Sequence, residues 1–191
     1  AAADRIIPII DLKNKINPNI ESEKLILSDG NIDFNKVSFA YKKNLDNNIL
    51  KEISLKFPGN KMTALVGHSG SGKSTLLNLI PRIYSPLNGN IKIDNQDIAL
   101  INLSSLRKEI SIVDQNTTLF DDTVFNNIKY ARPNASDEEV YEAAKLAMCE
   151  DFINNLEKGY DEMIGENGVR LSGGEKQRLS IARAFLKKSK I

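Results

Sequence analysis

The stretch Gly67-His68-Ser69-Gly70-Ser71-Gly72-Lys73-Ser74 matches the pattern G-x-x-x-x-G-K-[ST] at every fixed position. It follows the short apolar run Met62–Val66 and precedes apolar residues at helical spacing, which is the strand-to-helix context that the pattern requires. Glycines let backbone N–H groups turn inward around an anion without a clashing Cβ, and a helix beginning near Gly72 adds its positive dipole end. The sequence therefore predicts a phosphate-binding loop.

The side chains of this loop indicate which phosphate compound it holds. In such a loop Lys73 reaches the β- and γ-phosphates and Ser74 offers its hydroxyl to Mg²⁺, so we expect a nucleoside triphosphate and Mg²⁺ to bind here. His68, the only histidine, occupies a variable position and is interpreted as facing solvent or lying beside the backbone. A glycine-rich turn that merely joins a strand to a helix is the alternative. The predicted nucleotide-binding residues of this segment are Gly67, His68, Ser69, Gly70, Ser71, Gly72, Lys73, Ser74 and Thr75.

Short apolar patterns predict the strands. Apolar residues mostly alternate over residues 32–41, with one irregularity, and a second such segment covers 49–57. These two segments favour an antiparallel layer. Apolar runs at 62–66, 91–93 and 110–113 predict further short strands.

Two capping boxes predict where helices start. Ser136 is followed three residues later by Glu139, and Ser172 is followed by Glu175 in the same way. Strands and helices alternate after residue 60, which implies a parallel sheet with right-handed crossovers. The predicted fold class is therefore α/β: a core with a parallel sheet, an N-terminal antiparallel β layer and a helical part towards the C-terminus.

Composition excludes several classes of protein. The 191 residues carry 26 Lys and Arg against 25 Asp and Glu, and a net charge of +1 argues against a dedicated nucleic-acid binder. A single cysteine, Cys149, excludes an internal disulfide and fits a reducing compartment. No stretch has the roughly 18 consecutive apolar residues of a membrane span, and no signal-peptide pattern is present. The chain begins without methionine and ends at Ile191 within an apolar pattern, so we interpret it as a fragment.

A second motif lies at Leu171-Ser172-Gly173-Gly174-Glu175-Lys176-Gln177-Arg178. Ser172 is placed to cap a helix, and two glycines expose backbone N–H groups at the positive end of that helix. A well-capped helix with no further role is the alternative, although capping needs no glycine pair. The motif resembles the signature sequence of ATP-binding cassette (ABC) ATPases, although Glu175 stands where glutamine is commoner.

The resemblance assigns roles to residues elsewhere in the chain. Tyr41 matches the aromatic that stacks on adenine in this family, while core packing is its alternative role. Gln115 matches the loop glutamine that senses Mg²⁺ and the γ-phosphate, and it is predicted, with Lys73, to be catalytic; taken alone it would be an exposed polar residue. Ser74 and Gln115 are the implied metal ligands. Gly165–Gly168 resembles the loop through which exporters touch their membrane domains, with Asn167 in place of the commoner arginine.

The resemblance covers essentially the whole chain. Residues 1–12 look like the connection from the last transmembrane helix of an exporter, and 1–30 as a whole is interpreted as that connection and a linker. Residues 31–191 look like an ABC ATPase domain, with a P-loop NTPase core and a helical subdomain that carries the signature. The segments Leu79–Tyr84 and Thr123–Pro133 most resemble bacterial lipid and lipid A exporters.

The resemblance also implies a mechanism. Two ABC domains, here expected to be identical, bind ATP head to tail, so that the signature residues Leu171, Ser172, Gly173, Gly174 and Glu175 address the partner's ATP. The partners implied are that second domain and transmembrane domains of the same polypeptide, at the cytoplasmic face of the bacterial inner membrane, with no nucleic acid. The family's Walker B strand ending in Asp-Glu, and its loop histidine, have no match in these residues, so the fragment alone is expected to be inactive.

Two other functions are compatible with the motifs. A soluble ABC ATPase of DNA repair or translation would share them without a membrane partner, but the residues 1–12 and 165–168 favour an exporter. A non-catalytic nucleotide-binding module is the other alternative. The expected function is ATP hydrolysis that powers export of a lipid-like or other hydrophobic substrate.

Overall fold

The computed structural model describes residue 7, residues 23–41 and residues 48–191. The chain forms two compact units, residues 1–108 and residues 109–191, called here the N-terminal and C-terminal units. The predicted connection at residues 1–12 lies almost wholly outside the described residues.

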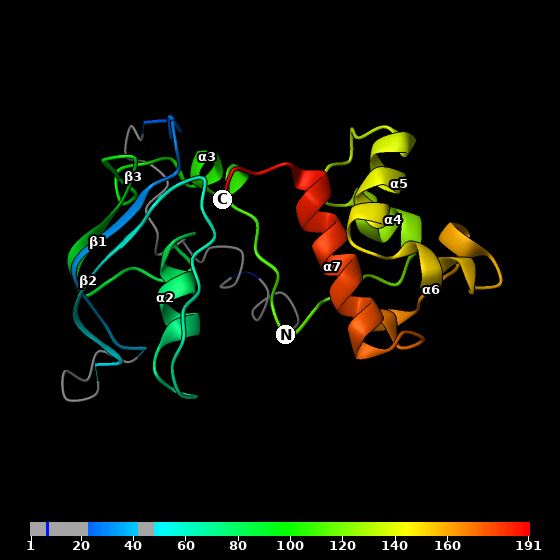
Figure 1. Ribbon diagram of the computed structural model, residues 1–191, viewed down its shortest axis with the longest axis horizontal. Coiled ribbons are helices and arrows are strands. Elements are labelled where there is room, and N and C mark those ends of the chain that lie inside the picture. Colours follow the sequence, from blue (N-terminus) through cyan, green and yellow to red (C-terminus); the bar gives the residue numbers. More distant parts are fainter. Residues whose placement is uncertain (1–6, 8–22, 42–47) are drawn as a thin grey trace. The chain divides into compact units, whose positions relative to one another are not determined.

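A four-stranded antiparallel sheet forms the main part of the N-terminal unit (Figure 1). Its strands are β1 (Ile32–Phe39), β2 (Leu50–Phe57), β3 (Asn88–Ile93) and β4 (Gln96–Asp97), in the spatial order β2-β1-β3-β4. β1 pairs with β2 on one side and β3 on the other, and every pair is antiparallel. The predicted antiparallel layer is therefore confirmed.

The irregularity predicted in the first strand is a β-bulge. Ile32 and Phe34 are buried at even positions, whereas Val37 and Phe39 are buried at odd ones. The change of phase falls between Phe34 and Val37, where the register with β2 shifts and Lys36 has φ 47°. One extra residue therefore keeps the apolar side chains on the same face of the sheet.

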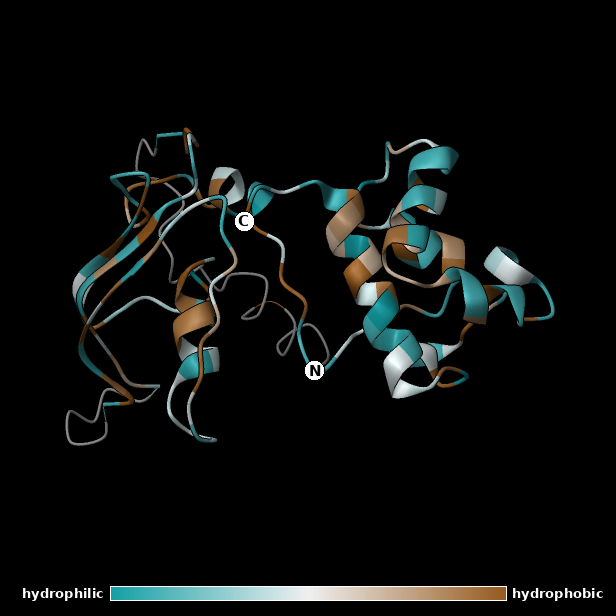
Figure 2. Cartoon of the chain, viewed as in Figure 1, coloured by the Kyte–Doolittle hydropathy of each residue, from teal (hydrophilic) through white to brown (hydrophobic). Residues whose placement is uncertain are grey.

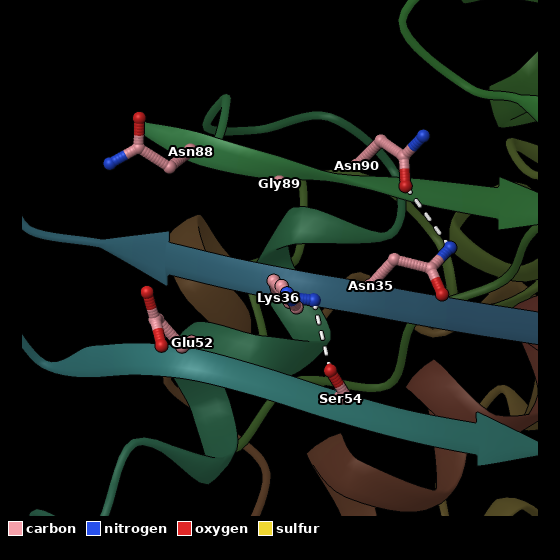
Figure 3. Close-up of a pocket in the computed structure, with 7 residues that line it drawn as sticks. All are labelled: Asn35, Lys36, Glu52, Ser54, Asn88, Gly89 and Asn90. Atoms are coloured by element: carbon pink, nitrogen blue, oxygen red, sulfur yellow. Dashed lines mark hydrogen bonds between the residues drawn. The ribbon is translucent and has the colours of Figure 1, made fainter.

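The opposite face of the sheet is polar around this bulge and has a depression of about 670 Å³ (Figure 3). Asn35 donates from Nδ2 to Oδ1 of Asn90 at 3.0 Å, and the Lys36 backbone N–H donates to Oγ of Ser54 at 3.0 Å. No residue of the phosphate loop lines this depression. Its polar groups form hydrogen bonds with one another across the strands, and these bonds stabilise the bulge.

A tight turn joins β3 to β4. Asp94 and Asn95 have φ of 46° and 66°, the positive values of a type I′ hairpin turn. The Asp94 carboxylate accepts backbone N–H bonds from Ser28, Gly30 and Asn31 at 2.8 to 3.1 Å. Partial burial alone would raise the pKa of Asp94, but these hydrogen bonds lower it from 3.8 to about 2. The turn thus fastens the segment that leads into β1.

Substitution Asp94→Asn should destabilise the protein by about 1–2 kcal/mol at pH 7, after a discount for solvent screening. Asparagine tolerates the left-handed backbone, so the variant isolates the loss of the charged acceptor. Because folding lowers this pKa, the stabilisation is complete above the ordinary value of 3.8 and is lost as pH falls through about 2. Urea unfolding of the wild type and the variant at pH 7 and near pH 2 measures this. If the difference in their free energies of unfolding is the same at both pH values, the prediction is wrong.

Two segments predicted as strands of a parallel sheet are not strands. Residues 62–66 have no ladder partner among the described residues, and Met62 and Val66 are 100% and 91% exposed. Residues 110–113 are also irregular, although Ser111 donates to the Ile191 carbonyl at 2.7 Å and Ile191 donates to that of Glu109 at 3.0 Å, as in a parallel pair. A β-strand forms only where a neighbouring strand supplies hydrogen-bond partners. The apolar run itself does not indicate whether such a strand is present.

Helices α2 (Lys73–Leu79) and α3 (Leu103–Lys108) complete the N-terminal unit. α2 begins within the predicted phosphate loop, and its apolar side chains Leu76 and Leu79 are buried. The sequence prediction of a helix after the loop is confirmed.

The C-terminal unit is helical. It contains α4 (Val124–Lys129), α5 (Asp137–Leu146), α6 (Glu150–Asn154), α7 (Gly173–Lys187) and the short 3₁₀ turns η2 (Gly159–Asp161) and η3 (Glu166–Gly168). Apolar residues of α7 alternate with polar ones in Figure 2, and Leu179, Ala182 and Leu186 are fully buried against the side chains of the other helices. Among the described residues no helix is long and apolar enough to cross a membrane.

Both predicted capping boxes are present. Ser136 caps α5 and exchanges hydrogen bonds with Glu139, and Ser172 caps α7 and exchanges them with Glu175. Each box satisfies two backbone N–H groups that a helix start leaves without a partner. Local sequence chemistry therefore sets the starts of the two longest helices.

Candidate functional site

The predicted phosphate loop is an exposed turn closed by its own lysine. The ammonium of Lys73 donates to the carbonyl oxygens of Gly67 at 2.9 Å and His68 at 2.8 Å, and to Oγ of Ser71 at 3.3 Å. The Ser71 N–H also donates to the His68 carbonyl at 3.2 Å. A positive charge is thereby held within the curve of the loop, where the sequence predicts phosphate.

Backbone geometry explains two of the glycines. Gly70 and Gly72 have φ of 80° and 90°, which disfavour any side chain. A Cβ on Gly72 would also lie 2.9 Å from Cδ2 of Leu50. Gly72 is the N-cap of α2 and supplies no side-chain hydrogen bond to the first turn. The N–H groups of that turn are therefore free of a capping side chain that would compete with an anion.

Tyr41 is brought to the first turn of α2. Its hydroxyl lies 3.0 Å from Oγ1 of Thr75, and its ring makes edge contacts with Phe39 and Tyr84 at centroid distances of 5.1 and 5.2 Å. Thr75 is buried, whereas the Tyr41 side chain is 53% exposed. One part of the ring is therefore packed and another is open to solvent, so its packing does not exclude stacking on a base.

The two predicted Mg²⁺ ligands, one in each unit, carry oxygen donors. Ser74 is exposed in the first turn of α2 and presents a hydroxyl oxygen, and Gln115, also exposed, lies in the C-terminal unit. Hard oxygen donors are what Mg²⁺ prefers, and it commonly uses one or two protein oxygens together with substrate phosphates and water. No cluster of three or more His, Cys, Asp or Glu among the described residues could hold a metal by itself. The residues fit an ion that is carried with the nucleotide.

The predicted signature forms an open helix start. Leu171 is buried, whereas Ser172, Gly173 and Gly174 are exposed. Oγ of Ser172 accepts the N–H of Glu175 at 3.4 Å, and the Glu175 carboxylate accepts the N–H of Ser172 at 2.7 Å. A Cβ on Gly173 would meet nothing within 4 Å. The glycines are thus not required by packing, and they leave space in front of the helix.

The loop before the signature contacts the segment that follows Gln115. Gly165 and Gly168 have φ of 73° and 64°, and Asn167 has φ 51° between them. A Cβ on Gly168 would lie 2.7 Å from Cδ1 of Leu119. Glycine at 168 therefore permits the close approach of these two segments.

The structure brings the predicted residues together in two sets. Tyr41 and residues 67–75 belong to the N-terminal unit, and Gln115 and residues 171–175 belong to the C-terminal unit. Sequence reasoning missed one further pair, Asn127 and Arg183, which bond to each other beside residues 118–120. The available signal was an arginine next to the apolar positions 179, 182 and 186 of the last helix.

A profile of the ABC transporter family matches residues 50–191, which include both the phosphate loop and the signature. The chain belongs to the ABC transporter family. The ABC ATPase fold follows from its likeness to a solved bacterial Atm1-family ABC exporter with ATP bound, at TM-score 0.92 and 41% identity over 97% of this chain and 32% of that one.

Curated ABC relatives include exporters. An ATP-dependent lipid A-core flippase of Syntrophus aciditrophicus is 48% identical over 100% of this chain, and a putative multidrug export ATP-binding/permease protein of Staphylococcus aureus is 49% identical over 95%. ABC transporter B family member 13 of Arabidopsis thaliana is 44% identical over 97%. The chain spans 31%, 31% and 15% of the lengths of these relatives, respectively. The expected resemblance to exporter ATPase domains is confirmed.

Proposed function

We propose that this chain is the domain that binds and hydrolyses ATP in an ABC exporter. The observation that carries the proposal is the pair of anion sites: a phosphate loop holding Lys73, and a helix start at Ser172 opened by two glycines. Relatives named as a lipid A-core flippase and a multidrug export protein support export of a lipid-like or other hydrophobic substrate.

In this proposal each loop residue has a defined task. Lys73 moves its ammonium from the Gly67 and His68 carbonyls to the β- and γ-phosphates, and the N–H groups after Gly72 bind phosphate oxygens. Tyr41 stacks on adenine. Ser74 and Gln115 would hold Mg²⁺, which would neutralise phosphate charge. Positioning and charge stabilisation then account for most of the catalysis.

A second copy of the domain completes each site. The exposed N-terminus of α7 addresses the ATP of the partner, so two identical chains bind two nucleotides head to tail.

Membrane domains are the other protein partner in this proposal. Phe120 and Tyr130 form an exposed aromatic pair with centroids 4.4 Å apart, 43% and 63% exposed, just beyond the Gln115 segment. Exposed aromatic side chains are typical of protein contact surfaces. With the loop at Gly165–Gly168, this pair is the proposed contact with transmembrane domains of the same polypeptide, at the cytoplasmic face of the membrane.

Substitution Tyr41→Ala should weaken ATP binding, since stacking of an aromatic ring on a base is worth about 1–3 kcal/mol, or roughly 5- to 150-fold in affinity. Tyr41→Phe is the matched control: it keeps the ring and loses only the hydrogen bond to Thr75. Calorimetric titration with ATP should place Tyr41→Phe near the wild type. Unchanged affinity in Tyr41→Ala would show that this tyrosine only packs against its neighbours.

A further inference from the structure

The segment that follows Gln115 is held in place by side chains. Residues 118–120 belong to no helix and no strand. Nη1 of Arg183 donates to the Thr118 carbonyl at 2.7 Å, and the Phe120 N–H donates to Oδ1 of Asn127 at 2.9 Å. The Asn127 amide returns a bond to the Phe120 carbonyl at 3.1 Å. The position of this segment therefore depends on one residue of α4 and one of α7.

Asn127 and Arg183 also bond to each other. Arg183 donates from Nε to the Asn127 carbonyl and from Nη2 to Oδ1 of Asn127, both at 2.7 Å. Asn127 is 1% exposed and donates further to the Thr123 carbonyl at 2.9 Å. Hydrogen-bond networks are rigid when every member is satisfied, and an unpaired polar group beside the buried Asn127 would be costly.

Within the described part of the chain, the groups that contact the Arg183 guanidinium include no carboxylate. They are carbonyl and amide oxygens, together with the ring of Phe120 at 5.6 Å from the guanidinium carbon. Burial lowers the pKa of Arg183, which reflects the cost of keeping this charge away from water, while Tyr130 acts in the opposite direction. An apolar residue could fill this place without the cost of removing a charge from water. The planar guanidinium is therefore explained by the groups that its several hydrogen bonds hold in position.

Arg183 and the signature share one rigid element. α7 is a continuous helix from Gly173 to Lys187 with Ser172 as its N-cap (Figure 1). Ser172 and Arg183 are therefore eleven residues apart, about 16 Å along the axis. A displacement of the signature end moves Arg183 with it.

We propose that Arg183, through Asn127, is a positioning residue that couples the signature to the segment carrying Gln115 and the exposed Phe120–Tyr130 pair. When ATP draws the signature towards the partner, Arg183 moves Thr118 and Phe120 in the same step. This inference rests on the proposed function, because it needs ATP to act on the signature.

The decisive variant is Arg183→Lys in the full-length protein. Lysine keeps a charge, but its single ammonium cannot reproduce the planar fork in which Nε, Nη1 and Nη2 of Arg183 each reach an acceptor. We expect kcat for ATP hydrolysis to fall by about 10- to 100-fold, as misplaced groups do in enzymes, while the affinity for ATP stays within about 2-fold. Hydrogen exchange of the peptide covering residues 118–122 should become faster. Asn127→Asp, which loses the amide donor to the Phe120 carbonyl, should give the same pattern.

The matched control is Arg132→Gln. Arg132 lies in the same unit and pairs with Glu139 of α5 at 2.5 Å, which is outside the segment 118–120. Its loss should lower the melting temperature and leave kcat unchanged where the protein is folded. The inference is overturned if kcat of Arg183→Lys falls only in proportion to the fraction of protein that is unfolded, as expected for the control.

The wild-type protein supplies a test that needs no variant. On addition of ATP, hydrogen exchange of residues 118–122 and of residues 171–175 should change together. Independent changes in a protein that responds to ATP overturn the coupling alone. A protein that shows no ATP binding overturns the proposed function as well, so the two failures are distinguishable.

Discussion

Lys73→Ala is expected to weaken ATP binding by about 10- to 150-fold, because one charged hydrogen bond to phosphate is worth about 1.5–3 kcal/mol. Turnover in the full-length protein should fall by at least as much, since the same charge stabilises the transferred phosphoryl group. Calorimetric titration and phosphate release measure the two effects.

The structure adds a second reason for a large effect. The Lys73 ammonium donates hydrogen bonds to two carbonyl oxygens of the loop, those of Gly67 and His68. Alanine leaves these oxygens facing an anion with no cation between them. Lys61→Ala is the control, because Lys61 is exposed in the same unit and lies outside the loop. If the two variants bind ATP equally well, the loop has been misassigned.

Ser172→Arg is expected to abolish ATP-dependent dimerisation while leaving ATP binding to a single chain nearly unchanged. Ser172 is exposed at the open start of α7, and a long side chain there would occupy the space that Gly173 and Gly174 leave for the partner's phosphate. Sedimentation with and without ATP measures the dimerisation, and titration measures the binding.

The control for lost capping is Ser136→Arg. Ser136 has the same role at the start of α5 in the same unit, with its own capping box. Both substitutions should cost about 1 kcal/mol of stability through the lost cap. Only Ser172→Arg should prevent dimerisation. Equal dimerisation of the two variants would mean that the signature does not contact the partner's nucleotide.

Local chemistry made part of this structure predictable. The capping boxes at Ser136 and Ser172, the helix after the phosphate loop and the irregular first strand all depend on residues close in sequence. Such patterns act through spacing alone. The glycine requirement at 72 was predictable for the same reason, although its closeness to Leu50 was not.

Features that depend on distant partners were beyond prediction. The apolar run 62–66 has the composition of a strand, but pairing requires a neighbour that the run itself cannot specify. Arg183 reaches a carbonyl 65 positions earlier and Asn127 lies 56 positions from it, so no local pattern reveals the network. The one sequence feature that indicated this network was the position of an arginine beside the apolar face of a helix.

In the proposed dimer, each ATP is held by the phosphate loop of one chain and the signature of another. The most direct test of this arrangement is ATP turnover by mixed dimers of the full-length protein, purified through two different tags, in which one protomer carries Lys73→Ala and its partner carries Ser172→Arg. One site of this dimer combines both defects, whereas the other has an unaltered loop and an unaltered signature. Because that second site is intact, we expect phosphate release well above that of either variant alone. A mixed dimer no more active than the two variants would contradict this arrangement.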